Sequence, residues 1–403
     1  MITTLSNYLD PRYKADVLEG YDGIVRVAIG GYYGTGTLLY DGKAILTAAH
    51  LFNGTLETST ASVYFETASG KQTVMSSSFT VYPNYDTVDS NNDLALVWLS
   101  ADAPTKAERY ELYRESDEIN QLFTMVGYGV SGYGAVGQID DYSDDYVRLM
   151  TQNRFDADAS TLKASLGSIM GWTPAVGTQL MADFDDGSTT HDAFGSFLGK
   201  IDKGVGVLEG MIAPGDSGGP AFIDGKVAGI ASYISSLSTY SNHPDNDDDA
   251  NSSFGEVGAW QRVSAYQQWI DQSIRAHYVN APTKPEEVQK AVYELNDGIS
   301  YAYFLLQFTG VRASSTDRLS VDYTTVDGTA KAGSDYIATQ GTLVLYPNEN
   351  QAVIPVEIIG DTTQESDETF YLDVFNPIGG SFGEGVVKLT AVRTIMNDDG
   401  IIL

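Results

Sequence analysis

Gly215-Asp216-Ser217-Gly218-Gly219-Pro220 is the stretch that decides the fold of this 403-residue chain. It places one serine hydroxyl among glycines, which let the backbone adopt angles that other residues resist and approach a bound molecule closely. A serine hydroxyl is a weak nucleophile until a neighbouring base accepts its proton. The stretch therefore indicates a nucleophile on a tight turn and predicts a base elsewhere in the chain.

Two stretches upstream supply a base and an acid. His50 ends the stretch Thr47-Ala48-Ala49-His50, and Asp93 directly precedes the apolar stretch 94–99. An imidazole can take the serine proton and return it to a leaving amine, while a carboxylate can hold the imidazole in one tautomer. A lone histidine after a strand, or a lone acid before one, is usually structural. The prediction therefore rests on the three stretches together, in the order His, Asp, Ser.

These stretches resemble the motifs of chymotrypsin-like serine peptidases, of the cysteine-free bacterial type, over residues 2–277. The resemblance implies a secreted serine endopeptidase that acts on polypeptides, with His50, Asp93 and Ser217 as its catalytic triad. It implies an oxyanion hole made by the N–H groups of Gly215 and Ser217. It also implies an activation ion pair between Asp216 and the α-amino group of Ile2, once Met1 has been removed.

The resemblance also implies a pocket for the side chain before the scissile bond. Its floor is Met211, six residues before the serine, and an acid there would select Arg or Lys, whereas methionine cannot. The walls are Ser232, Tyr233, Ile234 and Gly258. Because Ile234 stands where glycine is common, the expected pocket is short and apolar, and it prefers small or medium apolar side chains.

The pattern of apolar residues predicts an all-β chain of two domains. Short strands broken by glycine fill residues 24–129, and residues 264–277 have a helical period. With the resemblance, we expect a double six-stranded β-barrel with a C-terminal helix over residues 1–278. Residues 279–290 contain two prolines and predict a linker. Alternating strands over 291–403 are typical of an immunoglobulin-like β-sandwich.

The sandwich stretch resembles the Calx-β module of sodium–calcium exchangers and of secreted bacterial proteins, on motifs that include 321–336 and 359–368. The resemblance implies bound Ca²⁺, and loops whose acids converge at one end of a sandwich suit a cation that takes about six to eight oxygens. The implied ligands are Asp297, Asp335, Asp361, Glu365, Asp398 and Asp399, with Glu368 assisting. Gly360 and Asn397 stand where well-known calcium-binding members have Asp, and merely solvated loops stay an alternative.

A second acidic stretch, 245–256, has acids at the spacing of an EF-hand loop. These acids are Asp245, Asp247, Asp249 and Glu256. Ala250 stands where the loop expects glycine, and no flanking helix pair is indicated, so the stretch is either a local calcium loop or a solvated one. The stretch 183–187 is a similar candidate. We expect calcium to be structural or regulatory, because the chemistry of the triad needs no cofactor.

Composition limits the partners and the location. The chain has 54 acids against 23 bases, for a net charge of −31, which argues against nucleic acid because phosphate binding needs a basic face. It has no cysteine, and no apolar run approaches the ~20 residues of a membrane span. No signal peptide is visible. We therefore expect an extracellular or cell-surface location from the resemblance alone, with surface or matrix contact through the sandwich.

Two other functions stay open at this point. The chain is alternatively a calcium-binding adhesion protein whose peptidase domain is inactive or locked as a zymogen. Esterase activity is a third reading, because a serine triad also cleaves activated esters.

Overall fold

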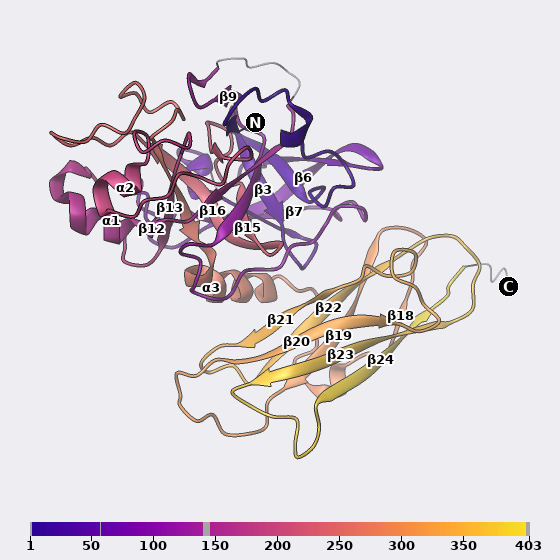
Figure 1. The fold of residues 1–403 in the computed structure, drawn as a ribbon. Coiled ribbons are helices and arrows are strands. Elements are labelled where there is room, and N and C mark those ends of the chain that lie inside the picture. The colour runs from indigo at the N-terminus through magenta and orange to yellow at the C-terminus, as the bar shows by residue number, and fades with distance from the viewer. Residues whose placement is uncertain (1, 57, 140–145, 400–403) are drawn as a thin grey trace. The chain divides into compact units, whose positions relative to one another are not determined.

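The computed structural model describes residues 2–56, 58–139 and 146–399. It divides into two compact units, Met1–Gln267 and Gln268–Leu403, and both are built mainly from β-strands (Figure 1). The predicted all-β fold class is confirmed. Each unit has its own hydrophobic core, so each is described by itself.

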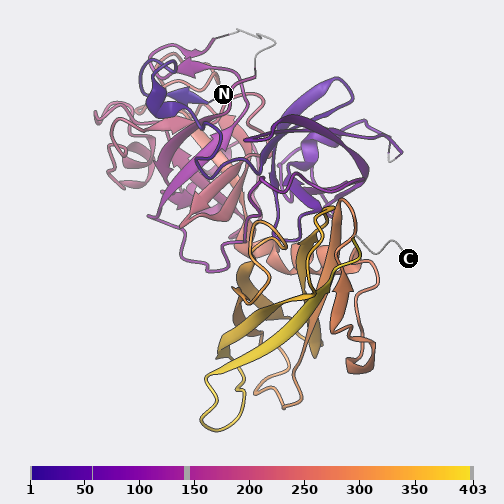
Figure 2. The same ribbon diagram turned by 90° about the vertical axis from the view of Figure 1, so that its right-hand side faces the viewer.

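The first unit begins with a closed six-stranded barrel in the order β2-β3-β4-β7-β6-β5, whose violet strands curve round a common core in Figure 2. Apolar residues alternate along the strands, so that Val25, Val27 and Val63 all face the inside. The strands are β2 (Ile24–Ile29), β3 (Tyr32–Leu38), β4 (Ala44–Thr47), β5 (Ser62–Thr67), β6 (Gly70–Val81) and β7 (Ala95–Leu99).

The second half of this unit is a seven-stranded sheet in the order β11-β8-β15-β16-β17-β13-β12. The two-residue strand β12 extends it beyond the six strands expected. Its core is aromatic: the rings of Phe123 and Phe155 stack at 4.0 Å, and Trp260 meets Phe123 edge-on at 5.0 Å. The strands are β8 (Leu122–Gly127), β11 (Leu149–Arg154), β12 (Ala157–Asp158), β13 (Gln179–Asp183), β15 (Pro220–Ile223), β16 (Lys226–Ser235) and β17 (Val257–Arg262).

A small sheet in the order β10-β9-β1-β14 holds the start of the chain. Thr3 pairs with Met211 on one side and with Gly132 on the other, so the N-terminal residues are built into the unit. The strands are β1 (Thr3–Thr4), β9 (Gly132–Tyr133), β10 (Gly137–Gln138) and β14 (Gly210–Met211).

The α-helices are short except for the last. An aspartate caps each of the first two: Asp158 accepts from the N–H groups of Ser160 and Thr161, and Asp192 accepts from that of Gly195. The third matches the helix predicted over 264–277 to within one residue at each end. The helices are α1 (Ala159–Leu166), α2 (Ala193–Leu198) and α3 (Val263–Ala276), and the 3₁₀-helices are η1 (Pro11–Tyr13), η2 (Ala49–Phe52), η3 (Gly167–Ile169) and η4 (Pro285–Glu287).

The second unit is a β-sandwich of a five-stranded sheet, β18-β24-β23-β20-β21, and a two-stranded sheet, β19-β22. Phe304 from the smaller sheet meets Phe370 from the larger one at 5.8 Å inside the core. The strands are β18 (Ala291–Tyr293), β19 (Ile299–Gln307), β20 (Leu319–Asp327), β21 (Gln340–Leu345), β22 (Gln351–Ile359), β23 (Glu368–Ile378) and β24 (Lys388–Met396).

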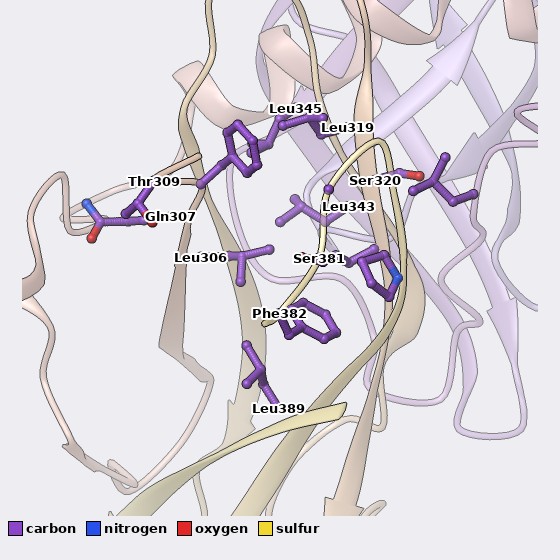
Figure 3. Close-up of a pocket in the computed structure, with 15 residues that line it drawn as sticks. Leu306, Gln307, Thr309, Leu319, Ser320, Leu343, Leu345, Ser381, Phe382 and Leu389 are labelled. Carbon is purple, nitrogen blue, oxygen red and sulfur yellow. The ribbon is translucent and has the colours of Figure 1, made fainter. Parts of the chain in front are cut away.

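The sandwich has two chemically different ends. An apolar cavity of about 210 Å³ lies at the end where β20 and β24 begin. Leu306, Phe382 and Leu389 are among the residues that line it (Figure 3). The acidic loops follow the other ends of β20, β22 and β24. Any calcium site formed by those loops is therefore separate from the apolar cavity.

Candidate active site

His50 and Asp93 meet where β4 and β7 pair in the first barrel, because η2 follows β4 and Asp93 precedes β7. His50 Nδ1 lies 2.8 Å from Asp93 Oδ2, and the backbone N–H of His50 donates to Asp93 Oδ1 at 2.8 Å. The Asp93 side chain is 2% exposed and that of His50 is 29% exposed. A buried carboxylate thus holds the imidazole by its Nδ1 edge. This arrangement leaves Nε2 as the ring atom that can accept a proton.

Ser232 on β16 supplies a further hydrogen bond to Asp93. Its Oγ donates to Asp93 Oδ2 at 2.5 Å. Gln261 Nε2 contacts Ser232 Oγ at 3.3 Å and donates to the Ser90 carbonyl oxygen at 2.7 Å. The sequence predicted Ser232 only as a pocket wall, and its contact with the acid is an additional role that the sequence did not indicate.

The loop that carries Ser217 is attached to the first barrel through Thr35 on β3. The Thr35 N–H donates to the Ser217 carbonyl oxygen at 2.8 Å, and Thr35 Oγ1 donates to that of Gly215 at 2.9 Å. Thr47 Oγ1, three residues before His50, donates to the Thr35 carbonyl oxygen at 2.7 Å. One threonine therefore connects the serine loop with the strand end that carries the histidine.

Glycine is required for the close approach of this loop. Gly215 and Gly218 have φ of +93° and +83°, in the region that L side chains rarely adopt. A Cβ on Gly218 would lie 2.1 Å from Thr47 Oγ1 and 2.7 Å from the backbone nitrogen of Ala48. The glycines of the motif thus bring the Ser217 loop directly against the residues that precede His50.

Asp216 and Ile2 are both buried, at 1% exposure each. The Asp216 carboxylate accepts from the N–H groups of Gly129 at 2.8 Å and Ala213 at 2.9 Å, and burial raises its pKa to about 6. The pairing of Thr3 with Met211 places Ile2 beside the segment that leads to Asp216. Met1 lies outside the described residues.

The structure brings three of the predicted pocket residues together, Met211, Ile234 and Gly258. The hydroxyl groups of Ser232 and Tyr233 instead bond to Asp93 and Gln179. A Cβ on Gly258 would lie 2.5 Å from Met211 Sδ, and Gly258 pairs with Ile234 across β16 and β17. Tyr233 is fixed by its hydroxyl, which donates to Gln179 Oε1 at 2.7 Å, and burial raises its pKa. Met211, at the predicted floor, is fully buried and is itself uncharged.

Acids of the second unit gather at one end of the sandwich. One oxygen each of Asp335, Glu365 and Glu368 lies within 4.8 Å of the other two. Glu294 is 3% exposed, and burial, with Asp361, Glu365, Asp335 and Asp399 nearby, raises its pKa to about 7. Glu294 Oε1 and Asp399 Oδ2 are buried and have no hydrogen-bond partner among the residues that the structure describes.

Comparison with known proteins agrees with this division of the chain. The family model described as Trypsin matches residues 19–167, and the one described as Calx-beta domain matches residues 287–399. The chain carries a trypsin domain followed by a Calx-beta domain. The matched part of the trypsin domain includes His50 and Asp93, whereas Ser217 lies beyond it. The trypsin domain assigns the first unit to the trypsin-like hydrolases.

Similar curated proteins are sodium/calcium exchangers. Sodium/calcium exchanger 2 of Homo sapiens is 33% identical over 153 residues, which cover 31% of this chain and 17% of the exchanger. Sodium/calcium exchanger Calx of Drosophila melanogaster is 40% identical over 83 residues, and sodium/calcium exchanger 1 of Felis catus is 49% identical over 82, each covering 20% of this chain and 8% of the exchanger. This chain therefore spans less than a fifth of each relative. Among the described residues, no helix is long and apolar enough to cross a membrane.

Within the Calx-beta domain, the predicted ligands differ in burial, and Glu365 is exposed. Asp297 and Asp398 are exposed, whereas Glu294 and Asp399 are buried. Glu294 was not among the ligands predicted from the sequence. The two-residue period of a strand gives the signal that could have found it, because Glu294 lies two residues after the buried Val292 and therefore faces the same side.

In the trypsin domain, the stretch 245–256 forms a partly buried loop. Ser253 links two of its acids: its N–H donates to Glu256 Oε1 at 2.8 Å and its Oγ to Asp245 Oδ1 at 3.2 Å. Asp245 Oδ2 and Glu256 Oε2 are buried and find no partner in the described part of the chain, and burial raises the pKa of Glu256 to about 7. Asp247 and Asp249 are exposed. A calcium loop at this stretch stays a prediction.

Proposed function

We propose that this chain is a secreted serine endopeptidase that hydrolyses peptide bonds through His50, Asp93 and Ser217. The observation that carries the proposal is the buried Asp93–His50 contact at 2.8 Å, next to residues against which the Ser217 loop packs. The geometry and the trypsin domain support it independently, since the family match does not extend to the serine.

In the proposed mechanism, Ser217 Oγ attacks the substrate carbonyl while His50 Nε2 takes its proton. Asp93 keeps the other proton on Nδ1 and stabilises the imidazolium that forms. The N–H groups of Gly215 and Ser217 stabilise the oxyanion, for which one donor typically contributes ~3 kcal/mol. His50 then protonates the leaving amine. Water next attacks the acyl-enzyme while His50 takes its proton, and His50 finally returns a proton to Ser217 Oγ as the acid product leaves.

Peptide-library cleavage tests this function directly. The N-terminally processed protein is expected to cleave after small or medium apolar residues such as Ala, Val, Leu or Met, because Met211 and Ile234 give the pocket an apolar floor and wall. Complete lack of cleavage would favour a calcium-dependent adhesion protein with an inactive peptidase domain. Fastest cleavage after Arg or Lys would show that the pocket is assigned wrongly.

Ile234→Gly is expected to widen the pocket. Removing the side chain opposite Gly258 admits aromatic rings, so the ratio of kcat/KM for Phe over Ala before the scissile bond should rise roughly 10- to 100-fold. The measurement uses two matched peptides that differ only at that residue. A ratio that stays constant, in a variant with an unchanged melting temperature, would place the specificity pocket elsewhere.

We further propose that Ile2 is the first residue of the active protein. Its burial beside the Asp216 segment supports an ion pair between the Ile2 α-amino group and the Asp216 carboxylate. N-terminal sequencing of the active protein is expected to give Ile-Thr-Thr. Full activity with a different first residue would contradict this proposal.

Calcium in the Calx-beta domain is also a proposal, and the residues present fit the ion. Glu294, Asp335, Asp361, Glu365, Glu368 and Asp399 offer only oxygen atoms, which are the ligands calcium prefers. Glu294 Oε1 and Asp399 Oδ2 are buried without hydrogen-bond partners among the described residues, and a bound cation would give both oxygen atoms a partner. The ion would stabilise the folded sandwich by mass action and take no part in peptide hydrolysis. A calcium site in the sandwich would suit the extracellular or cell-surface location that we propose.

A further inference from the structure

Three carboxylates of the trypsin domain are buried together outside the catalytic constellation. Asp183 ends β13, Asp185 follows two residues later, and Asp192 caps α2. Their side chains belong to residues that are 1%, 3% and 2% exposed. One oxygen of each lies within 4.8 Å of the oxygens of the other two.

A fourth buried acid, Glu209, comes from the other end of the same loop. Glu209 is 1% exposed, and its Oε2 accepts from the Val205 N–H at 2.6 Å, whereas its Oε1 has no hydrogen-bond partner. Gly204 lies between Glu209 and Asp185: a Cβ there would be 2.7 Å from Glu209 Oε2 and 2.9 Å from Asp185 Cβ. Asp185 Oδ1 is likewise buried, and within 2–56, 58–139 and 146–399 neither it nor Glu209 Oε1 has a hydrogen-bond partner.

The hydrogen bonds and basic residues nearby do not neutralise this group. Asp183 Oδ2 accepts from the Phe194 N–H at 2.9 Å, and Asp192 Oδ1 accepts from the Gly195 N–H at 2.5 Å. Arg154 pairs with Asp202 at 2.9 Å, and Lys200 donates to the carbonyl oxygen of Asp156 at 2.8 Å. Burial raises the pKa of Asp192, and this effect outweighs the charge of Lys203, which acts to lower it. Over 2–56, 58–139 and 146–399, no ion pair reaches the four carboxylates.

No basic side chain among the described residues forms an ion pair with these four carboxyl groups. Ionising them is therefore unfavourable, and their pKa values are raised. Burial, and then the neighbouring carboxylates, raises the pKa of Asp185 to about 11, and burial raises that of Asp183 to about 7. Burial also raises the pKa of Glu209 well above its ordinary value. Buried carboxylates in folded proteins are paired or bind a metal ion.

The donor set selects the kind of ion. All four side chains offer hard carboxylate oxygens, and neither histidine nor cysteine contributes, which disfavours zinc. Calcium accepts about six to eight oxygens in irregular geometry, so backbone carbonyls and water can complete the shell. We propose that Asp183, Asp185, Asp192 and Glu209 bind one calcium ion inside the trypsin domain.

Such an ion would hold the two ends of the loop 184–209 together, because Asp185 lies at its start and Glu209 at its end. The loop leaves β13 at Asp183 and returns through Glu209 into β14, where Met211 forms the predicted pocket floor and pairs with Thr3. Calcium would therefore order the pocket floor and the strand that receives the N-terminus. This consequence rests on the proposed peptidase function, whereas binding of the ion does not.

Hydrogen exchange measured by mass spectrometry on the full chain tests the proposal. Calcium chloride is added to chelator-treated protein, and exchange is followed in peptides from 184–209. We expect calcium to slow exchange there and to raise the melting temperature of the trypsin domain by roughly 5–10 °C when the ion is in about hundredfold excess over its Kd. Asp185→Asn should abolish both effects, and calorimetry should count one fewer calcium ion per chain.

Matched variants separate this site from the sandwich. Asp335→Asn should leave the calcium-dependent protection of 184–209 intact, and so should Asp186→Asn, whose carboxylate lies in the same loop but pairs with His191 at 2.8 Å. Without calcium, Asp185→Asn should unfold no lower than the unsubstituted protein, because it replaces a buried carboxyl group whose Oδ1 has no hydrogen-bond partner among the described residues. Glu209→Gln provides a second variant with the same expected loss. Equal protection by calcium in Asp185→Asn, or none in the unsubstituted protein, would overturn the proposal, and neither readout depends on catalysis.

Discussion

Ser217→Ala is expected to lower kcat on a cleavable peptide by about 10⁶-fold, with little change in KM. The variant removes the atom that attacks the carbonyl, so only the oxyanion donors and substrate binding remain to accelerate the reaction. The loop should keep its place, because its contacts with Thr35 use the carbonyl oxygens of Gly215 and Ser217 rather than the serine hydroxyl. Burst and steady-state kinetics with a fluorogenic peptide measure the effect.

The control for this variant is a serine elsewhere in the same unit. Ser252 Oγ donates to the Ile212 carbonyl oxygen at 2.9 Å and plays no part in the proposed chemistry. Ser252→Ala should retain most of the activity. Activity of Ser217→Ala close to that of the unsubstituted enzyme would mean that another residue is the nucleophile.

Asp93→Asn is expected to lower kcat by about 10⁴-fold near neutral pH while leaving the fold intact. The Asp93 carboxylate accepts from His50 Nδ1 and from Ser232 Oγ on the same oxygen. An amide at this position can present an N–H to the ring, which favours the tautomer with its proton on Nε2. His50 then cannot take the proton of Ser217. Steady-state kinetics, with the melting temperature measured alongside, check this prediction.

Ser232→Ala separates the role of the acid from that of its support. It removes one donor to Asp93 but leaves both hydrogen bonds from His50, so we expect it to lose less than about tenfold in kcat. A loss as large as that of Asp93→Asn would mean that Ser232 positions the histidine as much as the acid does. No loss in Asp93→Asn itself would remove the acid from the mechanism.

The architecture could be predicted because it depends on local patterns. Short strands broken by glycine over 24–129 indicated a β-rich unit, the family resemblance implied its barrels, and the helical period of 264–277 indicated α3. The short helices α1 and α2 have weaker signals, because each has fewer than three turns and depends on its aspartate cap. Their cap residues were visible in the sequence only as further acids in an acidic chain.

The role of Ser232 could not be derived from residue order. The pairing of β16 with β17 shifts register between Ala231 and Tyr233, so Ser232 lies at a bulge. A bulge changes the direction in which a side chain points, and here it directs the hydroxyl toward Asp93. Sequence spacing identified the strand but not this reorientation.

The buried acids show a second limit of sequence reasoning. Asp183, Asp185 and Asp192 are close in the sequence, but Glu209 joins them only because the loop returns past Gly204. In the Calx-beta domain, the cluster likewise depends on loops from distant strands. Each acid alone is compatible with a solvated surface, and burial without a counter-ion among the described residues is what makes an acid a candidate cation ligand.

Labelling with a serine-directed fluorophosphonate, with the adduct located by mass spectrometry, tests the central claim most directly. We predict one adduct per N-terminally processed chain, on Ser217, formed rapidly in the unsubstituted protein and at least a thousandfold more slowly in His50→Ala. An adduct on a different residue, or no adduct on the processed protein in the presence of calcium, would contradict the account.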